Sequence, residues 1–153
     1  MTSHIALLRG VNVGGNVLKM ERLRAVLTDL GLADVKTYVQ SANVLFMATR
    51  PAAKLAQRIE AKLAGEARLP VSVIIRTPAQ LGRIIEANPF LGEAGVDART
   101  LHVTFLAGRA PRPGLAALGA VASGADRWRA AGAEIYLHCP GGYGRTKLNN
   151  TAI

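Results

Sequence analysis

The chain has 153 residues, and half of them are hydrophobic, which is enough for one ordinary domain or two small ones and excludes a disordered chain. Nineteen Lys and Arg residues against ten Asp and Glu residues give a net charge of +9. This excess favours an anionic partner such as nucleic acid, a phosphorylated ligand or an acidic surface. A codon bias towards Ala, Arg and Gly would produce the same excess, so the charge alone leaves both interpretations open.

The apolar runs, the N-terminus and the single cysteine indicate the cellular setting. No apolar run approaches the roughly 20 residues that a membrane-spanning helix needs. The first residues lack the basic and apolar segments of a signal peptide. Cys139 is the only cysteine, so no internal disulfide can form. Together these features predict a cytoplasmic protein that does not contact a membrane.

The first 77 residues predict the element order β-α-β-β-α-β. Apolar residues recur at helical spacing in residues 19–31, where Gly31 has the position of a C-cap, and after Pro51, which suits the first helical position. The predicted strands are residues 4–9, 35–40, 43–47 and 71–76, with a tight hairpin at 41–42. Right-handed crossovers fold this order into an antiparallel sheet of order 4-1-3-2 with both helices on one face.

The same order begins again after a connecting helix that Asn88-Pro89 ends. The predicted elements are strands at 100–106, 126–129 and 134–139, a helix at 113–121 and the start of another helix at 147–148. We therefore expect an α+β fold of two consecutive ferredoxin-like (βαββαβ) halves, residues 1–77 and 100–153, joined by a connecting helix and linker at 78–99. We expect the second half to be truncated at its C-terminus, so that restoring a helix and a strand raises the melting temperature.

Several segments resemble the bacterial family known as domain of unknown function 1697. They are residues 6–15, 19–20, 37–44, 88–90 and 144–148. Ala42 departs from the glycine that the family usually has in the hairpin. The resemblance implies two ferredoxin-like halves, and members commonly continue through another helix and strand beyond Leu148. It implies no activity.

Two glycine-rich loops lie between a predicted strand and a predicted helix, where backbone N–H groups can bind a phosphate. The first, which fits neither a Walker A loop nor G-x-G-x-x-G, offers Arg9, Gly10, Asn12, Gly14, Gly15 and Lys19. The alternative for this loop is a wide turn in which Asn12 and Asn16 bond local backbone. The second loop offers Gly141, Gly142, Gly144, Arg145 and Lys147.

We expect the first and third strands of the βαββαβ sheet to be central, parallel neighbours. On that expectation the loop with Arg109 and Arg112 lies beside the second glycine-rich loop, and four cations reach one ligand. The alternative is a solvated basic rim. A basic stripe of Lys54, Arg58 and Lys62 on the second helix is interpreted as a solvated face.

The outer sheet face of the second half is a weaker candidate for RNA stacking. Strand alternation turns Leu101, Val103, Phe105, Ile135 and Leu137 towards the helices. His102, Thr104, Tyr136 and His138 then face outward, where RNA-recognition modules stack bases. Since the aromatic signature of those modules is absent, we expect this face to pack on the other half or on a partner chain, which leaves a homo-oligomer open.

The sequence offers no metal site, cofactor motif or catalytic group that stands out. His138 and Cys139 point to opposite faces of one strand, and the carboxylates form no close pair. We expect a binder of an anionic, phosphate-bearing small molecule. An enzyme acting on a phosphorylated small molecule and a nucleic-acid binder with a basic surface are the alternatives.

Overall fold

The computed structural model describes residues 1–12, 15, 17–38, 43–122 and 124–148. The predicted hairpin at 41–42 and the loop residues Gly14 and Asn16 lie outside them. The chain divides into two compact units, Met1–Leu81 and Gly82–Ile153. Helix α3 (Pro78–Glu86) crosses this boundary, and each unit is described by itself.

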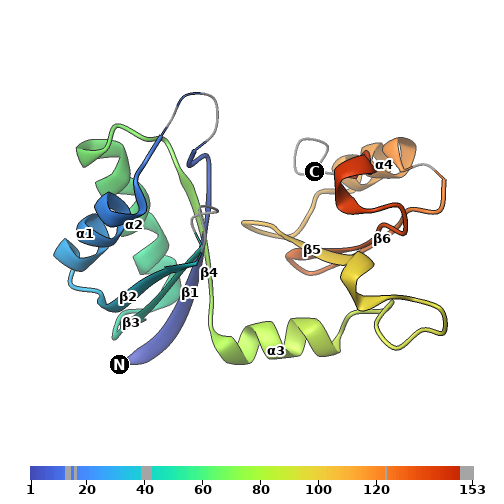
Figure 1. Cartoon of the computed structure of the whole chain (residues 1–153), viewed down its shortest axis with the longest axis horizontal. Helices are drawn as coiled ribbons and strands as arrows, with labels where there is room; N and C mark the ends of the chain where they lie inside the picture. Colours follow the sequence, from blue (N-terminus) through green and yellow to red (C-terminus); the bar gives the residue numbers. More distant parts are fainter. Residues whose placement is uncertain (13–14, 16, 39–42, 123, 149–153) are drawn as a thin grey trace. The chain divides into compact units, whose positions relative to one another are not determined.

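The first unit is a four-stranded antiparallel sheet with two helices on one face (Figure 1). Its elements are β1 (Thr2–Arg9), α1 (Met20–Asp29), β2 (Ala33–Tyr38), β3 (Asn43–Ala48), α2 (Ala52–Glu66) and β4 (Ser72–Arg76). The strands lie in the order β2-β3-β1-β4, and each neighbouring pair is antiparallel. Read from the other edge, this is the predicted order 4-1-3-2.

The core of the first unit lies between the sheet and the helices. Alternate strand residues face this layer, and the helices add one apolar stripe each. Its fully buried members include Ala6, Leu23, Val26, Leu27, Val44, Ile59 and Leu63. Full burial of a Leu or Ile side chain stabilises a fold by about 1.5–3 kcal/mol, so this layer holds the unit together.

Glycines with positive φ end α1 and shape the turn after β1. Gly31 (φ +85°) follows α1, and its N–H donates to the Thr28 carbonyl at 2.9 Å, as expected of a glycine C-cap. Gly10 (φ +96°) follows β1, and a Cβ placed there would lie 3.1 Å from the Pro70 carbonyl oxygen. Glycine is therefore favoured at position 10 for two reasons: the positive φ, and the close approach of the backbone at Pro70.

Replacing Gly10 by Ala tests this close approach. Gly15 (φ +86°) is the matched control, because a Cβ placed there meets nothing within 4 Å. Both Gly10→Ala and Gly15→Ala strain the backbone, and only the first crowds Pro70. We expect Gly10→Ala to be less stable than Gly15→Ala by about 1 kcal/mol, measured by thermal unfolding with circular dichroism. Equal stabilities would contradict the assigned contact.

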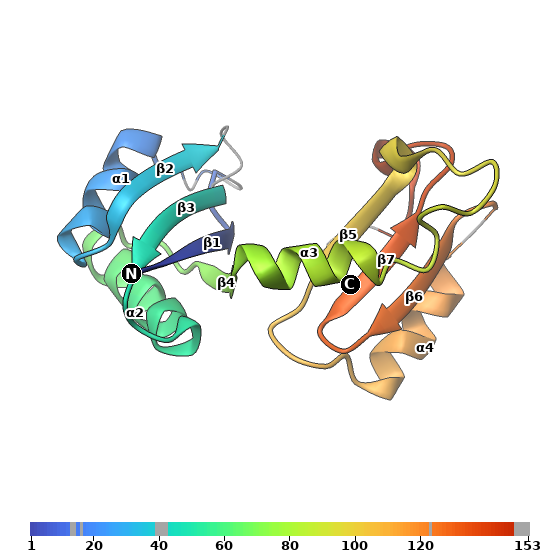
Figure 2. The same ribbon diagram turned by 90° about the horizontal axis from the view of Figure 1, so that it is seen from below.

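The second unit is a three-stranded antiparallel sheet of order β5-β7-β6. Its elements are the 3₁₀ turn η1 (Ala98–Thr100), β5 (Leu101–Phe105), α4 (Arg112–Val121), β6 (Arg127–Ala131), β7 (Glu134–His138) and the 3₁₀ turn η2 (Tyr143–Arg145). Figure 2 shows α4 on one face of this sheet, with the end of α3 and the segment after it on the other. The α4 face carries a core of Leu118, Ile135, Leu137, Cys139 and Leu148.

The strand register corrects the predicted orientation of β5. His102 pairs with Leu137, and Thr104 pairs with Ile135. Directly opposed residues of an antiparallel pair point to the same face, so His102 and Thr104 lie on the α4 face. Leu101, Val103 and Phe105 share the other face with Tyr136 and His138, opposite to the prediction. Alternation was correct within each strand, but it could not give the register between strands.

The segment after α3 covers the face that carries Tyr136 and His138. The Tyr136 hydroxyl donates to the Ile84 carbonyl at 2.8 Å, and the buried Phe90 ring lies 6.0 Å from the His138 ring. Asn88 shapes this segment, since its side-chain oxygen accepts from the Phe90 N–H at 3.0 Å. Tyr136 and His138 are 2% and 8% exposed, so neither can stack a base. The covering segment belongs to the same chain and the same unit. The prediction that this face packs on the other half or on a partner chain is therefore wrong.

Arg127 contacts the covering segment at Phe90 and Glu93. Its guanidinium lies 4.7 Å from the Phe90 ring centroid, forms an ion pair with Glu93 at 2.9 Å and contacts His138 Nδ1 at 3.0 Å. A guanidinium has no acceptor, so the Arg127 N–H groups donate to Nδ1 of His138 in this contact. The Asn88-Pro89-Phe90 motif is thus explained by packing.

Candidate functional site

The predicted convergence of four cations in the second unit is wrong. Strands β5 and β7 are antiparallel, with Phe105 opposite Glu134 and Leu101 opposite His138. The loops that follow the two strands therefore leave opposite ends of the sheet. Arg109 and Arg112 lie at one end, and Arg145 and Lys147 lie at the other. The prediction failed because it assumed that the first and third strands run parallel.

Three amides of the second glycine-rich loop are hydrogen-bonded within the loop or to Cys139 directly after β7. The N–H groups of Gly142, Arg145 and Thr146 donate to the carbonyls of Cys139, Gly142 and Tyr143 at 2.9, 3.2 and 3.3 Å. Arg145 and Lys147 are exposed, as are Gly141 and Gly144. This arrangement is a turn with a basic surface, and the three bonded amides are not available to the expected phosphate cradle.

Thr146 explains the buried part of this loop. Its hydroxyl donates to Asp126 Oδ2 at 2.6 Å and accepts from the Leu148 N–H at 3.0 Å. Burial raises the pKa of the adjacent Cys139 thiol, and the negative charge of Asp126 adds to this while a hydrogen bond with Thr146 offsets part of it. Cys139 is fully buried, which fits a structural thiol. Among the described residues, no group of three His, Cys, Asp or Glu side chains is placed to hold a metal ion.

The first glycine-rich loop is also shaped by internal contacts. Asn12 has φ +57°, and its side-chain oxygen accepts from the Leu18 N–H at 2.8 Å. This bond confirms the structural interpretation for Asn12. Gly10 meets Pro70, and Gly14 lies outside the described residues. Arg9, Gly15 and Lys19 are exposed around the loop.

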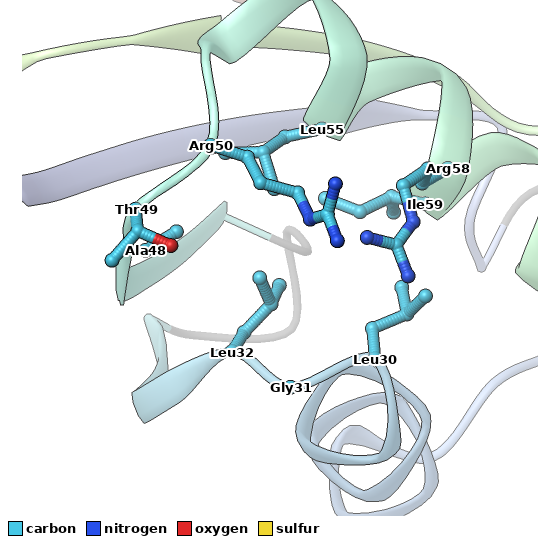
Figure 3. Close-up of a pocket in the computed structure, with 9 residues that line it drawn as sticks. All are labelled: Leu30, Gly31, Leu32, Ala48, Thr49, Arg50, Leu55, Arg58 and Ile59. Carbon is cyan, nitrogen blue, oxygen red and sulfur yellow. The ribbon is translucent and has the colours of Figure 1, made fainter. Parts of the chain in front are cut away.

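A different strand-to-helix junction in the first unit brings two cations together. The junction from β3 to α2 and the turn from α1 to β2 enclose a pocket lined by Leu30, Gly31, Leu32, Ala48, Thr49, Arg50, Leu55, Arg58 and Ile59. Figure 3 shows the guanidinium groups of Arg50 and Arg58 pointing toward one another above Leu30 and Leu32. Arg50 comes from the junction itself, and Arg58 comes from the second turn of α2.

The local sequence explains how this pocket is built. Leu55 and Ile59 are buried on the core side of α2, which turns their helical neighbour Arg58 to the border between the core and solvent. Gly31 ends α1 so that Leu32, 6% exposed, can turn back into the core. The floor of the pocket is therefore apolar and fixed, and its rim carries the two positive charges.

The charged side chains that line this pocket are both positive. No carboxylate of the described residues lies within ion-pair distance of Arg50 or Arg58, and Thr49 carries the only hydroxyl among the lining residues. In contrast, Lys62 on the same helix is paired with Glu66 at 2.6 Å. Two guanidinium groups that face each other repel unless an anion lies between them. This arrangement can bind a compact anion.

Sequence reasoning did not find this site. The spacing of Lys54, Arg58 and Lys62 predicts a solvated basic stripe, and no sequence pattern connects Arg50 with it. The available signal was the position of Arg50 directly before Pro51, at the start of a helix that carries Arg58 two turns later. The antiparallel direction of β3 was also needed, since it brings the end of β3 beside the α1–β2 turn.

Comparison with known proteins decides the family. The family described as Protein of unknown function (DUF1697) matches residues 1–136. The chain belongs to this family. The DUF1697 resemblance predicted from the sequence motifs is therefore confirmed. In the DUF1697 chain, none of the helices among the described residues combines the length and apolar character that a membrane span requires.

A solved structure with a similar fold comes from Streptococcus pneumoniae, where it is described as a conserved bacterial protein. It is 25% identical to the DUF1697 chain with a TM-score of 0.75, and the match covers 95% of this chain and 82% of that one. No curated protein matches the chain. The comparisons therefore give the family and a related fold, and the activity has to be argued from the site.

Proposed function

We propose that the chain binds a phosphate-bearing small molecule through Arg50 and Arg58. The observation that supports this proposal is the convergence of two guanidinium groups, without a carboxylate partner among the described residues, above an apolar floor. The predicted ligand class stays the same. We place its site at the junction of β3 and α2 and not at the glycine-rich loops, because the amides of Val17 and Leu18 at the first loop and of Gly142, Arg145 and Thr146 at the second bond internally.

The chemistry of the two arginines favours a phosphate monoester over a carboxylate. Guanidinium groups bind carboxylate and phosphate oxygens through paired N–H donors. A phosphate monoester carries a charge of about −1.5 to −2 at pH 7, which matches two cations better than a single negative charge does. The cavity volume of about 40 Å³ suits one compact group. The rest of the ligand is expected to extend into solvent.

The lining residues favour binding over catalysis. None of the nine is a His, Asp, Glu, Lys or Cys, so none can transfer a proton near neutral pH. Arg50 and Arg58 are exposed, and an enzyme acting on a phosphorylated molecule would need water to be excluded from the reacting group. The proposed activity is therefore recognition of a phosphate group.

Isothermal titration of the full chain with inorganic phosphate tests the proposal. Arg50→Gln and Arg58→Gln should each weaken binding by about tenfold, because each removes one charge-assisted contact. Lys54→Gln is the matched control, since Lys54 is exposed on the same helix and does not line the pocket. It removes the same charge and should change the affinity less than twofold.

Two outcomes would contradict the proposal. Equal losses in all three variants would show a response to net charge and no specific site. Tight binding of single-stranded RNA with a steep salt dependence, unchanged in Arg50→Gln, would favour the nucleic-acid alternative, since each neutralised phosphate contributes about −0.7 to the slope on single strands.

We also propose that the first unit is a ferredoxin-like βαββαβ repeat and that the second is an incomplete one. The support is that β5-β7-β6 follows the same relative order as β1, β3 and β2 in the first sheet. Helix α4 corresponds to α1 in this alignment. Superposition of the two units in an experimental structure tests the proposal, and a left-handed connection between β5 and β6 would contradict it.

A further inference from the structure

A second pocket lies in the Gly82–Ile153 unit and shares no lining residue with the proposed phosphate site. It is formed by the loop after β5, the first two turns of α4 and the start of β7. Its lining residues are Leu106, Ala107, Gly108, Arg109, Ala110, Pro111, Gly114, Leu115, Ala117, Leu118 and Ile135. Its volume of about 360 Å³ falls in the range of about 300–1,000 Å³ that is typical of small-molecule sites.

The wall of this pocket is apolar. Leu118 and Ile135 are 2% exposed and belong to the core of the unit, so they form a fixed base. Leu106 and Leu115 pack against the same core. A ligand with a hydrocarbon body would remove this surface from water, and the gain is roughly proportional to the apolar area buried.

Arg109 is the only charged residue among those that line the pocket. Within the described part of the chain, no carboxylate lies within ion-pair distance of it. The loop therefore places one unneutralised guanidinium at the rim of an apolar cavity. A ligand that complements both features has one anionic head group and an apolar body.

We propose that this pocket binds an amphipathic monoanion, namely a carboxylate with a hydrocarbon chain. The carboxylate contacts Arg109, and the chain lies against Leu106, Leu115 and Leu118. This site differs in chemistry from the Arg50 and Arg58 pocket, which is small and carries two positive charges. Each site is therefore expected to bind its own ligand class independently of the other.

Titration of the full chain with decanoate, below its micelle concentration, tests this site. Decanol is the uncharged probe of the same chain length. Decanoate should saturate one site, and decanol should bind about tenfold more weakly because it lacks the charge-assisted contact. Arg109→Gln should reduce the affinity for decanoate to that for decanol.

Two matched pairs of variants separate the site from general effects. Arg109→Gln and Arg112→Gln remove the same charge three residues apart, and only Arg109 lines the pocket. Ala117→Phe fills the pocket, whereas Ala116→Phe adds the same side chain at an exposed neighbour that does not line it. We expect Arg112→Gln and Ala116→Phe to bind decanoate within twofold of the unchanged chain, and Ala117→Phe to lose binding.

Circular dichroism verifies that each variant is folded. Ala117 and Ala116 are both exposed on α4, so neither substitution disturbs the core. Absence of saturable decanoate binding to the unchanged chain would overturn the proposal. Equal losses within either pair of variants would also overturn it, because the effect would then not depend on the pocket.

Discussion

Phe90→Ala should lower the free energy of unfolding of the Gly82–Ile153 unit by about 3–5 kcal/mol, the cost typical of removing a buried Phe. Phe90 is 4% exposed, and its ring contacts His138 and the Arg127 guanidinium. The substitution removes the apolar surface that covers one face of the sheet. Trp128 is the only tryptophan of the chain and lies in β6, so its fluorescence in a urea titration reports on this unit alone.

Leu91→Ala is the matched control for Phe90→Ala. Leu91 is the next residue along the chain and is 46% exposed. A substitution at such a site usually changes stability by less than about 0.5 kcal/mol. If Phe90→Ala had an equally small effect, the segment after α3 would not be part of the folded unit.

Thr146→Val should destabilise the same unit by about 1–3 kcal/mol, because it removes the partner of the buried Leu148 N–H and of the half-buried Asp126 carboxylate. Thr146 is 7% exposed, and its hydroxyl bonds both Asp126 Oδ2 and the Leu148 N–H. Valine keeps the shape of threonine and loses both bonds. The same urea titration with Trp128 fluorescence measures the loss.

Thr146→Ser separates the hydroxyl from the methyl group. Serine keeps both hydrogen bonds and removes one methyl group, so we expect Thr146→Ser to be more stable than Thr146→Val. The reverse order would show that Thr146 stabilises the loop by packing, and the proposed role of its hydroxyl would be wrong.

Most of the secondary structure could be predicted from the sequence because each element carries its own periodicity. The spacing of Leu23, Val26 and Leu27 identifies α1, and Gly31 marks its end within two residues. The α+β class and the antiparallel sheets followed from the element order. These features depend on neighbours in the chain, which a sequence pattern contains.

The errors concern relations between strands. The side of the sheet on which His102 lies depends on its pairing with Leu137, and no local pattern gives that register. The expected cluster of Arg109 and Arg145 depended on strand direction, which was assigned wrongly. The proximity of Arg50 and Arg58 also depends on relations between strands. Their pocket forms because the end of β3 lies beside the α1–β2 turn, and no local sequence pattern gives that arrangement.

The position of a bound phosphate analogue tests the central claim most directly. Crystals of the full chain soaked in arsenate, whose anomalous scattering identifies the arsenic atom, would locate the anion. The proposal predicts a peak between the guanidinium groups of Arg50 and Arg58. A peak at residues 9–15 or 141–147 with none between these two arginines, or no peak at any site, would contradict it.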